Sequence, residues 1–154
     1  MKRRVVEALV LLCLAGCTPG AAVLAPTAGT GGSAKIVDVN LTLHGATQTL
    51  AGTSGGYAPP SITVAVGTAI VFTNSDGFAH TATLIPNAMS FPAGTPFSSS
   101  AQAQSGSSAS GGFSSGTLQA GQTSQRIVID RAGTYLYGCF FHYGAPMRGT
   151  IVAQ

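Results

Sequence analysis

The chain has 154 residues, a length that leaves room for one domain; 45% of them are hydrophobic and only 7% are charged. Glycine occurs 21 times and β-branched residues dominate the apolar runs, a composition typical of a β protein with many turns. Most of the formal net charge of +3 comes from residues 2–4. Without the first 16 residues, four cations face three anions, which is a net charge of +1. Nucleic-acid binding requires a basic stripe, and this composition does not provide one.

Residues 1–16 have the pattern of a signal peptide. Three basic residues precede an apolar run that is too short for a permanent membrane span. The run ends in Leu-Ala-Gly before Cys17, which resembles the lipobox of bacterial lipoproteins, where the cysteine is lipidated and becomes the new N-terminus. The resemblance implies an exported protein, held by its lipid on a bacterial membrane and facing the periplasm or the cell exterior. The alternative is an ordinary secretory signal that happens to contain Cys17.

Residues 17–34 connect this leader to the domain. They are mostly Ala, Gly, Pro and Thr without charge, which is typical of a flexible linker. We expect the domain to occupy residues 35–154. Cys13 lies in the leader and Cys17 would carry lipid, so Cys139 would be the lone thiol of the mature protein. An unpaired thiol in an exported protein needs a chemical reason, and metal ligation is one.

Short strand-like runs separated by turn residues follow one another along the domain, and no run has a helical period. About seven to eight such strands predict an all-β fold, a β-sandwich. Residues 98–116 are an exception, because they are almost entirely Ser, Ala, Gly and Gln. We expect a low-complexity surface loop there, which could be shortened without loss of metal binding. The predicted strands are 36–43, 61–66, 69–72, 80–85, 123–129, 134–137 and 148–153.

The loop before the last predicted strand carries three potential metal ligands, with the spacing Cys-x2-His-x4-Met. Cys139 offers a thiolate, His142 an imidazole and Met147 a weak thioether. A short loop cannot enclose an ion alone, and His80 follows a turn-rich segment that could meet this loop at one end of a sandwich. A thiolate, two imidazoles and a weak axial thioether are the ligands of a mononuclear blue-copper electron-transfer site. The sequence therefore predicts one copper ion, cycling between Cu(I) and Cu(II).

Each ligand has a plainer alternative. A free cysteine can be a small core hydrophobe, and Met147 can fill a gap in the core. His142 can be an ordinary surface histidine. His44 competes with His80, but it lacks a turn motif of its own, so we place it on the surface. Met89 is assigned to packing rather than to the metal.

Several segments together resemble the plastocyanin-type cupredoxins. The resemblance covers about residues 35–154 and implies an eight-stranded Greek-key β-sandwich with one copper ion. It places His80, Cys139 and His142 in the equatorial positions and Met147 in the axial one. Plastocyanins commonly have an asparagine, which ties the ligand loops together, where this chain has Thr81. Photosynthetic plastocyanins often have an aromatic residue before the cysteine and an acidic docking patch. This chain has neither feature. The matching segments are 57–68, 72–74, 80–82 and 133–147.

Four protein ligands leave no open position for a substrate, so we expect the chain not to be an enzyme. The leading function is one-electron transfer outside the cytoplasm between redox protein partners, by a monomer. Phe78, Phe141, Tyr143 and Pro146 flank the ligands and could form a partner-docking face; alternatively, they pack over the ligand loops. The other candidate is a copper-handling protein that sequesters or delivers the metal. Such proteins favour exposed Met or His clusters, which this chain lacks.

Overall fold

The computed structural model describes residues 33–154, and β-strands dominate this part of the chain. The predicted signal peptide (1–16), Cys17 and nearly all of the predicted linker (17–34) lie outside the described residues. Within them, no helix is both long and apolar enough to cross a membrane. The strands are β1 (Lys35–Val39), β2 (Thr47–Thr49), β3 (Gly52–Ser54), β4 (Tyr57–Ala58), β5 (Ser61–Val64), β6 (Ala69–Asn74), β7 (Thr83–Ile85), β8 (Gln104–Ser108), β9 (Gly112–Ser115), β10 (Ile127–Val128), β11 (Gly133–Gly138) and β12 (Arg148–Ala153).

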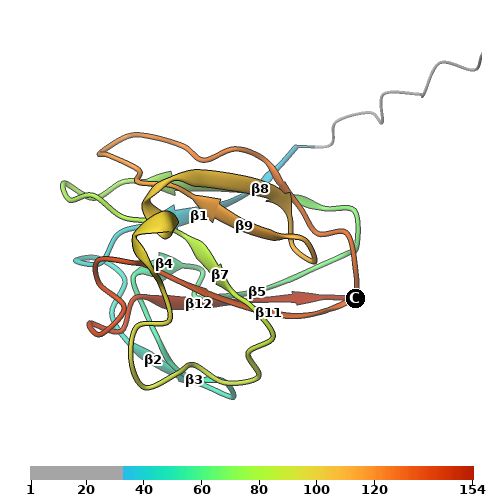
Figure 1. Ribbon diagram of the computed structural model, residues 1–154, viewed down its shortest axis with the longest axis horizontal. Helices are drawn as coiled ribbons and strands as arrows, with labels where there is room; N and C mark the ends of the chain where they lie inside the picture. Colours follow the sequence, from blue (N-terminus) through green and yellow to red (C-terminus); the bar gives the residue numbers. More distant parts are fainter. Residues whose placement is uncertain (1–32) are drawn as a thin grey trace, which may run out of the picture.

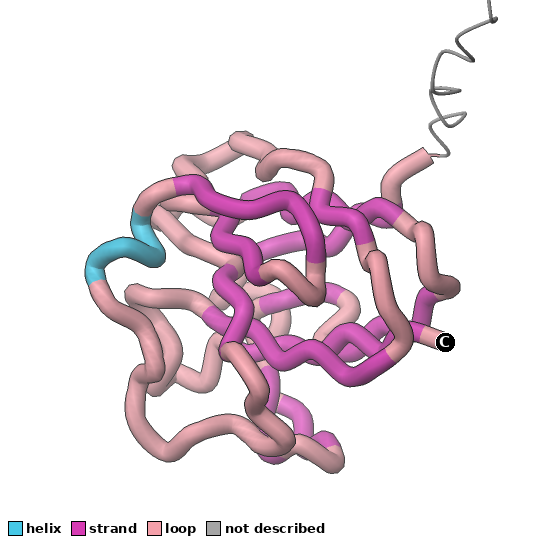
Figure 2. Tube along the Cα trace, turned by 45° about the vertical axis from the view of Figure 1, so that its right-hand side comes forward, coloured by secondary structure: helices cyan, strands magenta, loops and turns pink. Residues whose placement is uncertain are grey.

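Ten of these strands form one continuous sheet that curls over itself into two layers (Figures 1 and 2). Its order is β4-β1-β6-β10-β8-β9-β7-β11-β12-β5, and β2 pairs with β3 as a separate hairpin. The sheet is mixed, because β1 runs parallel to β6 and β5 runs parallel to β12. The predicted all-β sandwich is confirmed. The structure has more strands than predicted because several are only two or three residues long.

The core lies between the two layers, where alternate residues of each strand point inward. Three aromatic rings occupy its centre: Tyr137 packs edge-to-face against Tyr57 at 4.8 Å and against Phe72 at 5.0 Å between ring centroids. These contacts join β11, β4 and β6. Aliphatic side chains from both layers surround the rings, including Val37, Val39, Ile62, Val64, Ile70, Ile127 and Ile151.

The first strand is shorter than its apolar alternation predicted. β1 ends at Val39, because the Asn40 side-chain oxygen accepts hydrogen bonds from the backbone N–H groups of Thr42 (3.1 Å) and Leu43 (2.9 Å). An asparagine that bonds the backbone in this way favours a turn over a strand. Leu43, which the alternation placed inside, is 72% exposed.

Most of residues 98–116 are in regular structure, and the prediction of a surface loop for this segment was wrong. A 3-10 helix, η1 (Ser99–Gln102), leads into the β8–β9 hairpin, which joins the two layers of the sheet. Serine hydroxyls satisfy backbone groups: Ser114 donates to the carbonyl of Ala101 (2.7 Å), and Ser115 accepts from the N–H of Ala82 (2.8 Å). Phe113 is buried beside Phe72. One aromatic anchor and short hydroxyl side chains are thus enough to pack a segment of low complexity.

Deletion of residues 100–111 should therefore destabilise the protein. The deletion removes β8 and the buried Ala101 and Ala109. We expect the melting temperature of the metal-free protein to fall by roughly 10 °C or more, which corresponds to a loss of several kcal/mol. Thermal circular dichroism would measure this. Deletion of residues 93–95, which are exposed and outside any strand, is the control. Equal melting temperatures for the two deletions would restore the loop interpretation.

The chain enters the sheet at the end opposite to the predicted ligands. β1 pairs with β6 in parallel register, so that Lys35 lies beside Ile70 and Val39 beside Asn74. β6 then continues into the loop that carries His80. In Figure 1 the first described residues lie at the upper right, away from the orange-red β11–β12 loop on the left side of the molecule. The predicted ligand loops thus gather at the end of the domain that is farther from the start of β1.

Candidate metal centre

The structure brings three of the four predicted ligands together. His80, Cys139 and His142 offer donor atoms that all lie within 4.8 Å of one another. The two Nδ1 atoms of the histidines are 3.1 Å apart, and the Cys139 Sγ lies 3.8 Å from each. His80 and Cys139 are fully buried, and His142 is half-buried. The centre therefore reaches the surface through one imidazole.

These donor positions fit a single transition-metal ion. Zinc, a comparable first-row metal, bonds nitrogen at about 2.0–2.1 Å and sulfur at about 2.3 Å, so donors separated by 3.1 and 3.8 Å can share one ion. Burial raises the pKa of the Cys139 thiol, and burial followed by the nearby His80 lowers the pKa of His142. At neutral pH the metal-free site consequently holds a protonated thiol and a neutral His142 imidazole. Metal binding would release the thiol proton.

His80 is held by the loop that follows β6. The Asn74 side chain donates to the carbonyls of Phe78 (2.7 Å) and Leu118 (2.9 Å), which closes this loop. The backbone of His80 then exchanges two hydrogen bonds with Leu118, at 3.1 and 2.8 Å. Because both the loop and its end are bonded to the same neighbouring residue, the backbone at His80 has a defined position.

The loop from Cys139 to Met147 is closed by its own backbone. Cys139 N–H donates to the carbonyl of Met147, and Met147 N–H donates to the carbonyl of His142, both at 3.1 Å. Gly138 precedes the cysteine, and a Cβ there would lie 2.8 Å from the ring of Tyr143. An aromatic residue before the cysteine, as in photosynthetic plastocyanins, would collide with this ring. Glycine is the residue that lets Tyr143 pack under the loop.

Thr81 links the His80 loop to the cysteine loop, a role that the sequence alone did not establish. Its hydroxyl accepts a hydrogen bond from Phe140 N–H at 2.9 Å, and its own N–H points to the Cys139 Sγ at 3.4 Å. The carbonyl of Thr81 in turn accepts from the hydroxyl of Tyr57 at 2.5 Å. A threonine therefore links the His80 loop to the cysteine loop and supplies an N–H to the sulfur.

Comparison with known proteins identifies the family of this chain. Residues 46–154 match the family described as copper binding proteins, plastocyanin/azurin family. The chain belongs to this family. Copper is therefore its cofactor, and the fold is the Greek-key sandwich of a cupredoxin. A plastocyanin from Scenedesmus fuscus is 30% identical over 98 residues, which is 64% of this chain and 86% of that protein.

Solved structures of other cupredoxins are similar but distant in sequence. A purple cupredoxin from Nitrosopumilus maritimus has 20% identity and a TM-score of 0.49, covering 78% of this chain and 99% of that one. An oxidized amicyanin mutant has 18% identity and a TM-score of 0.48, covering 79% of this chain and 82% of that one.

Met147 is buried in the core of this cupredoxin beside Cys139. Its axial role stays a prediction, supported by full burial and by the backbone bond to Cys139. Gly56, which sequence reasoning missed, makes room for it: a Cβ at Gly56 would lie 2.5 Å from the Met147 Cγ. Gly56 has φ +69°, a left-handed conformation that favours glycine. The glycine pair of residues 55–56 was the available signal, but nothing in the sequence linked it to the methionine.

Substitution of Gly56 by alanine should disturb the thioether. Alanine at this φ costs about 1–2 kcal/mol, and its methyl group would also push the buried Met147 side chain aside. We expect a lower melting temperature together with a changed visible spectrum of the copper form. Gly67→Ala is the matched control, because Gly67 also has positive φ (+90°) but nothing within 4 Å of its Cβ position. A changed spectrum in both variants, or in neither, would argue against a specific role for Gly56.

The predicted docking residues separate into two groups. Phe78 and Phe141 are 62% and 41% exposed, and Pro146 is half-buried. Tyr143 is only 2% exposed, so its assignment to a docking face was wrong. Its ring lies beneath the Arg148 guanidinium at 4.1 Å and packs edge-to-face against Phe97.

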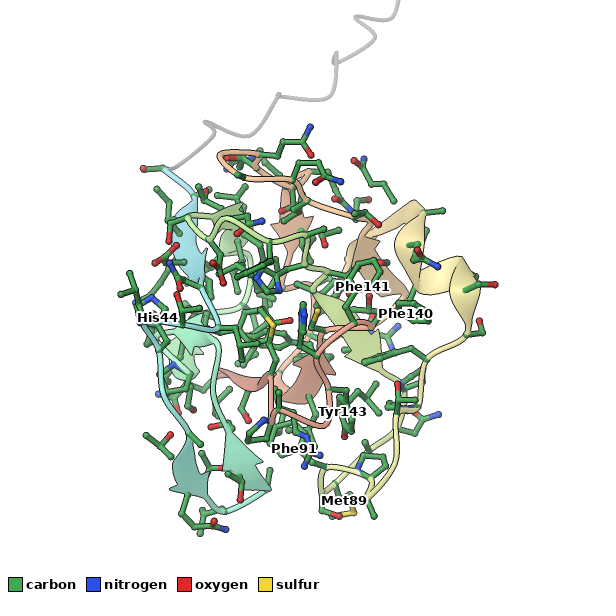
Figure 3. The ribbon with its side chains drawn as sticks, turned by 90° about the vertical axis from the view of Figure 1, so that its left-hand side faces the viewer. His44, Met89, Phe91, Phe140, Phe141 and Tyr143 are labelled. Atoms are coloured by element: carbon green, nitrogen blue, oxygen red, sulfur yellow. The ribbon has the colours of Figure 1, made fainter. Side chains whose placement is uncertain are left out.

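The two competing residues lie apart from the site. His44 is half-buried, and its Nε2 lies 2.7 Å from a carboxylate oxygen of Asp38. Met89 is 94% exposed, so its assignment to packing was wrong. Figure 3 shows Phe141 near the middle of the view, Met89 at the lower edge and His44 at the left edge.

Proposed function

We propose that this cupredoxin carries single electrons between redox protein partners outside the cytoplasm. The arrangement of the three donors carries this proposal: two are fully buried, and only the half-buried His142 reaches the surface. A partner at this edge could exchange an electron through the imidazole while the ion stays shielded from water. The exposed Phe78 and Phe141 offer apolar contact area on the loops that carry His80 and His142.

Backbone and threonine hydrogen bonds hold the ligand loops without a metal, which suits a carrier. An electron carrier needs similar ligand positions in both oxidation states, whereas a delivery protein must release its ion. The Cys139–Met147 loop and the Thr81 tie support retention of the metal. Protein ligands would fill the coordination shell, so a substrate has no open position, and the proposed activity is not enzymatic.

We also propose that a lipid on Cys17 holds the protein on a bacterial membrane surface. β1 starts at the end of the domain away from the ligand loops. The 18 residues from 17 to 34 span at most roughly 60 Å when fully extended. An anchor attached at this end would leave the ligand end free to meet partners.

Spectroscopy and voltammetry of the mature copper-loaded protein test the carrier function. We expect an intense thiolate-to-copper band in the visible spectrum and a reversible one-electron couple. Electron exchange with small redox proteins should be fast and should leave the copper content unchanged. Loss of the ion to a metal-free acceptor protein during reduction, with no reversible couple, would favour copper handling instead.

Replacing Cys17 with serine should release the protein from the membrane fraction without changing its visible spectrum. The reason is that the predicted lipid attaches to this thiol, while the copper ligands lie in the separate domain. Fractionation of cells and immunoblotting would measure the release, with the wild-type protein as control. A variant that stays in the membrane with an uncleaved leader would indicate a plain signal anchor.

A further inference from the structure

A buried carboxylate contacts the outer nitrogen of the ligand His80. The Asp76 Oδ2 lies 3.0 Å from the His80 Nε2, and the two side chains are 5% and 0% exposed. The same oxygen accepts from Leu41 N–H at 3.1 Å, and Oδ1 accepts from Gly77 N–H at 2.7 Å. The pair comes from the loop after β6, and the turn after β1 covers it. Sequence reasoning used neither Asp76 nor this turn for the metal site.

These contacts determine which nitrogen of His80 carries the proton. An ionised carboxylate can only accept hydrogen bonds, and its two backbone partners can only donate. The His80 Nε2 must therefore be the N–H donor in the third bond. This leaves the lone pair on Nδ1, the atom that faces Cys139 and His142.

The hydrogen bonds around the carboxylate are those of an ionised group. Oδ1 accepts from Gly77 N–H, and Oδ2 accepts from Leu41 N–H and from His80, so three donors stabilise a negative charge on this side chain. A negative charge consequently sits one imidazole ring away from the metal position. Charges interact strongly where water is excluded.

We propose that Asp76 is a positioning residue of the copper centre, which holds His80 with Nδ1 free for the metal and stabilises Cu(II) relative to Cu(I) by its charge. The inference rests on the copper site described above. Hydrogen bonding to a carboxylate makes a ligand imidazole more basic, and partners of this kind are typically worth about 10–100-fold in metal affinity. Because Cu(II) carries one more positive charge than Cu(I), it gains more from the nearby anion. Asp76 should thus lower the reduction potential.

The variant Asp76→Asn removes the charge and keeps a hydrogen-bonding side chain of the same shape. We expect its affinity for Cu(II) to fall about tenfold relative to Cu(I), which raises the reduction potential by about 59 mV. Asp38→Asn is the matched control, because Asp38 also pairs with a histidine, His44, which is not a ligand. We expect its potential to move by less than a third as much. Equal shifts in the two variants would overturn the charge effect.

Nitrogen-15 NMR of the metal-free wild-type protein tests the positioning effect without any substitution. We expect His80 to show a protonated Nε2 and an unprotonated Nδ1. The opposite tautomer, or rapid exchange between the two, would overturn the positioning role. This readout remains available if the asparagine variant fails to fold. It is also independent of electron transfer: a protein without a reversible couple would contradict the carrier function, while the tautomer would still decide the role of Asp76.

Discussion

Replacing Cys139 with serine will abolish the visible charge-transfer band of the copper form, and the domain will still fold. The thiolate is the donor for that band, and a serine hydroxyl does not ionise near neutral pH. The fold should survive because its core consists of aromatic and aliphatic side chains from both layers of the sheet. The substitution shortens one buried side chain, and we expect a stability loss of roughly 1–2 kcal/mol in the metal-free protein.

Absorption and EPR spectra of the copper-loaded serine variant would measure the first effect, and thermal circular dichroism of the metal-free variant the second. Cys17→Ser is the control for a cysteine-to-serine change outside the centre. A serine variant that keeps the intense band would exclude Cys139 as the ligand. A serine variant that does not fold without metal would show that the fold depends on the Cys139 thiol as well as on the aromatic and aliphatic core.

Replacing Met147 with leucine will keep the coloured centre but raise its reduction potential. A thioether is a weak axial donor that favours Cu(II), so its removal makes Cu(I) relatively more stable. If Cu(II) loses about tenfold more affinity than Cu(I), the potential rises by about 59 mV. Leucine has a similar volume, and the buried site should accept it at a cost below about 1.5 kcal/mol.

Voltammetry would measure this shift, with Met89→Leu as the control, because Met89 is exposed and away from the site. An unchanged or lowered potential in the Met147 variant would exclude an axial thioether at this position. His80→Ala should behave differently from both, since it opens an equatorial position to water and degrades the centre. The three variants together distinguish a change in reduction potential caused by the axial ligand from loss of the copper site.

The Cys-x2-His-x4-Met loop was predictable from the sequence because its chemistry is local. Cys139 and His142 lie close together in one loop between two strands, so their spacing indicates a shared ion; the role of Met147 in the same loop stays a prediction. His80 was also predictable, since a turn-rich segment places it at a strand end. The short strand-like runs separated by turn residues likewise predicted where β5, β6, β11 and β12 lie and which fold class they form.

The composition of residues 98–116 gave the wrong prediction for a physical reason. Low complexity indicates a loop when a segment cannot bury apolar area, but Phe113 supplies such area here. The serine hydroxyls bond backbone groups of other segments, as Ser115 does with Ala82. Such bonds follow no period along the chain, so no sequence window contains them.

Only the tertiary structure decided what surrounds the ligands. The turn after β1 brings Leu41 to Asp76 across 35 positions of sequence, and Tyr57 reaches Thr81 across 24. Tyr143 follows His142 in the sequence, but its burial depends on contacts with Arg148 and Phe97 that the sequence did not show. Local spacing therefore indicated Cys139 and His142, whereas their approach to His80, 59 positions from the cysteine, requires the folded chain. The tautomer of His80, the space for Met147 and the surface left for partners depend on contacts between distant segments, which arise only when the two layers pack.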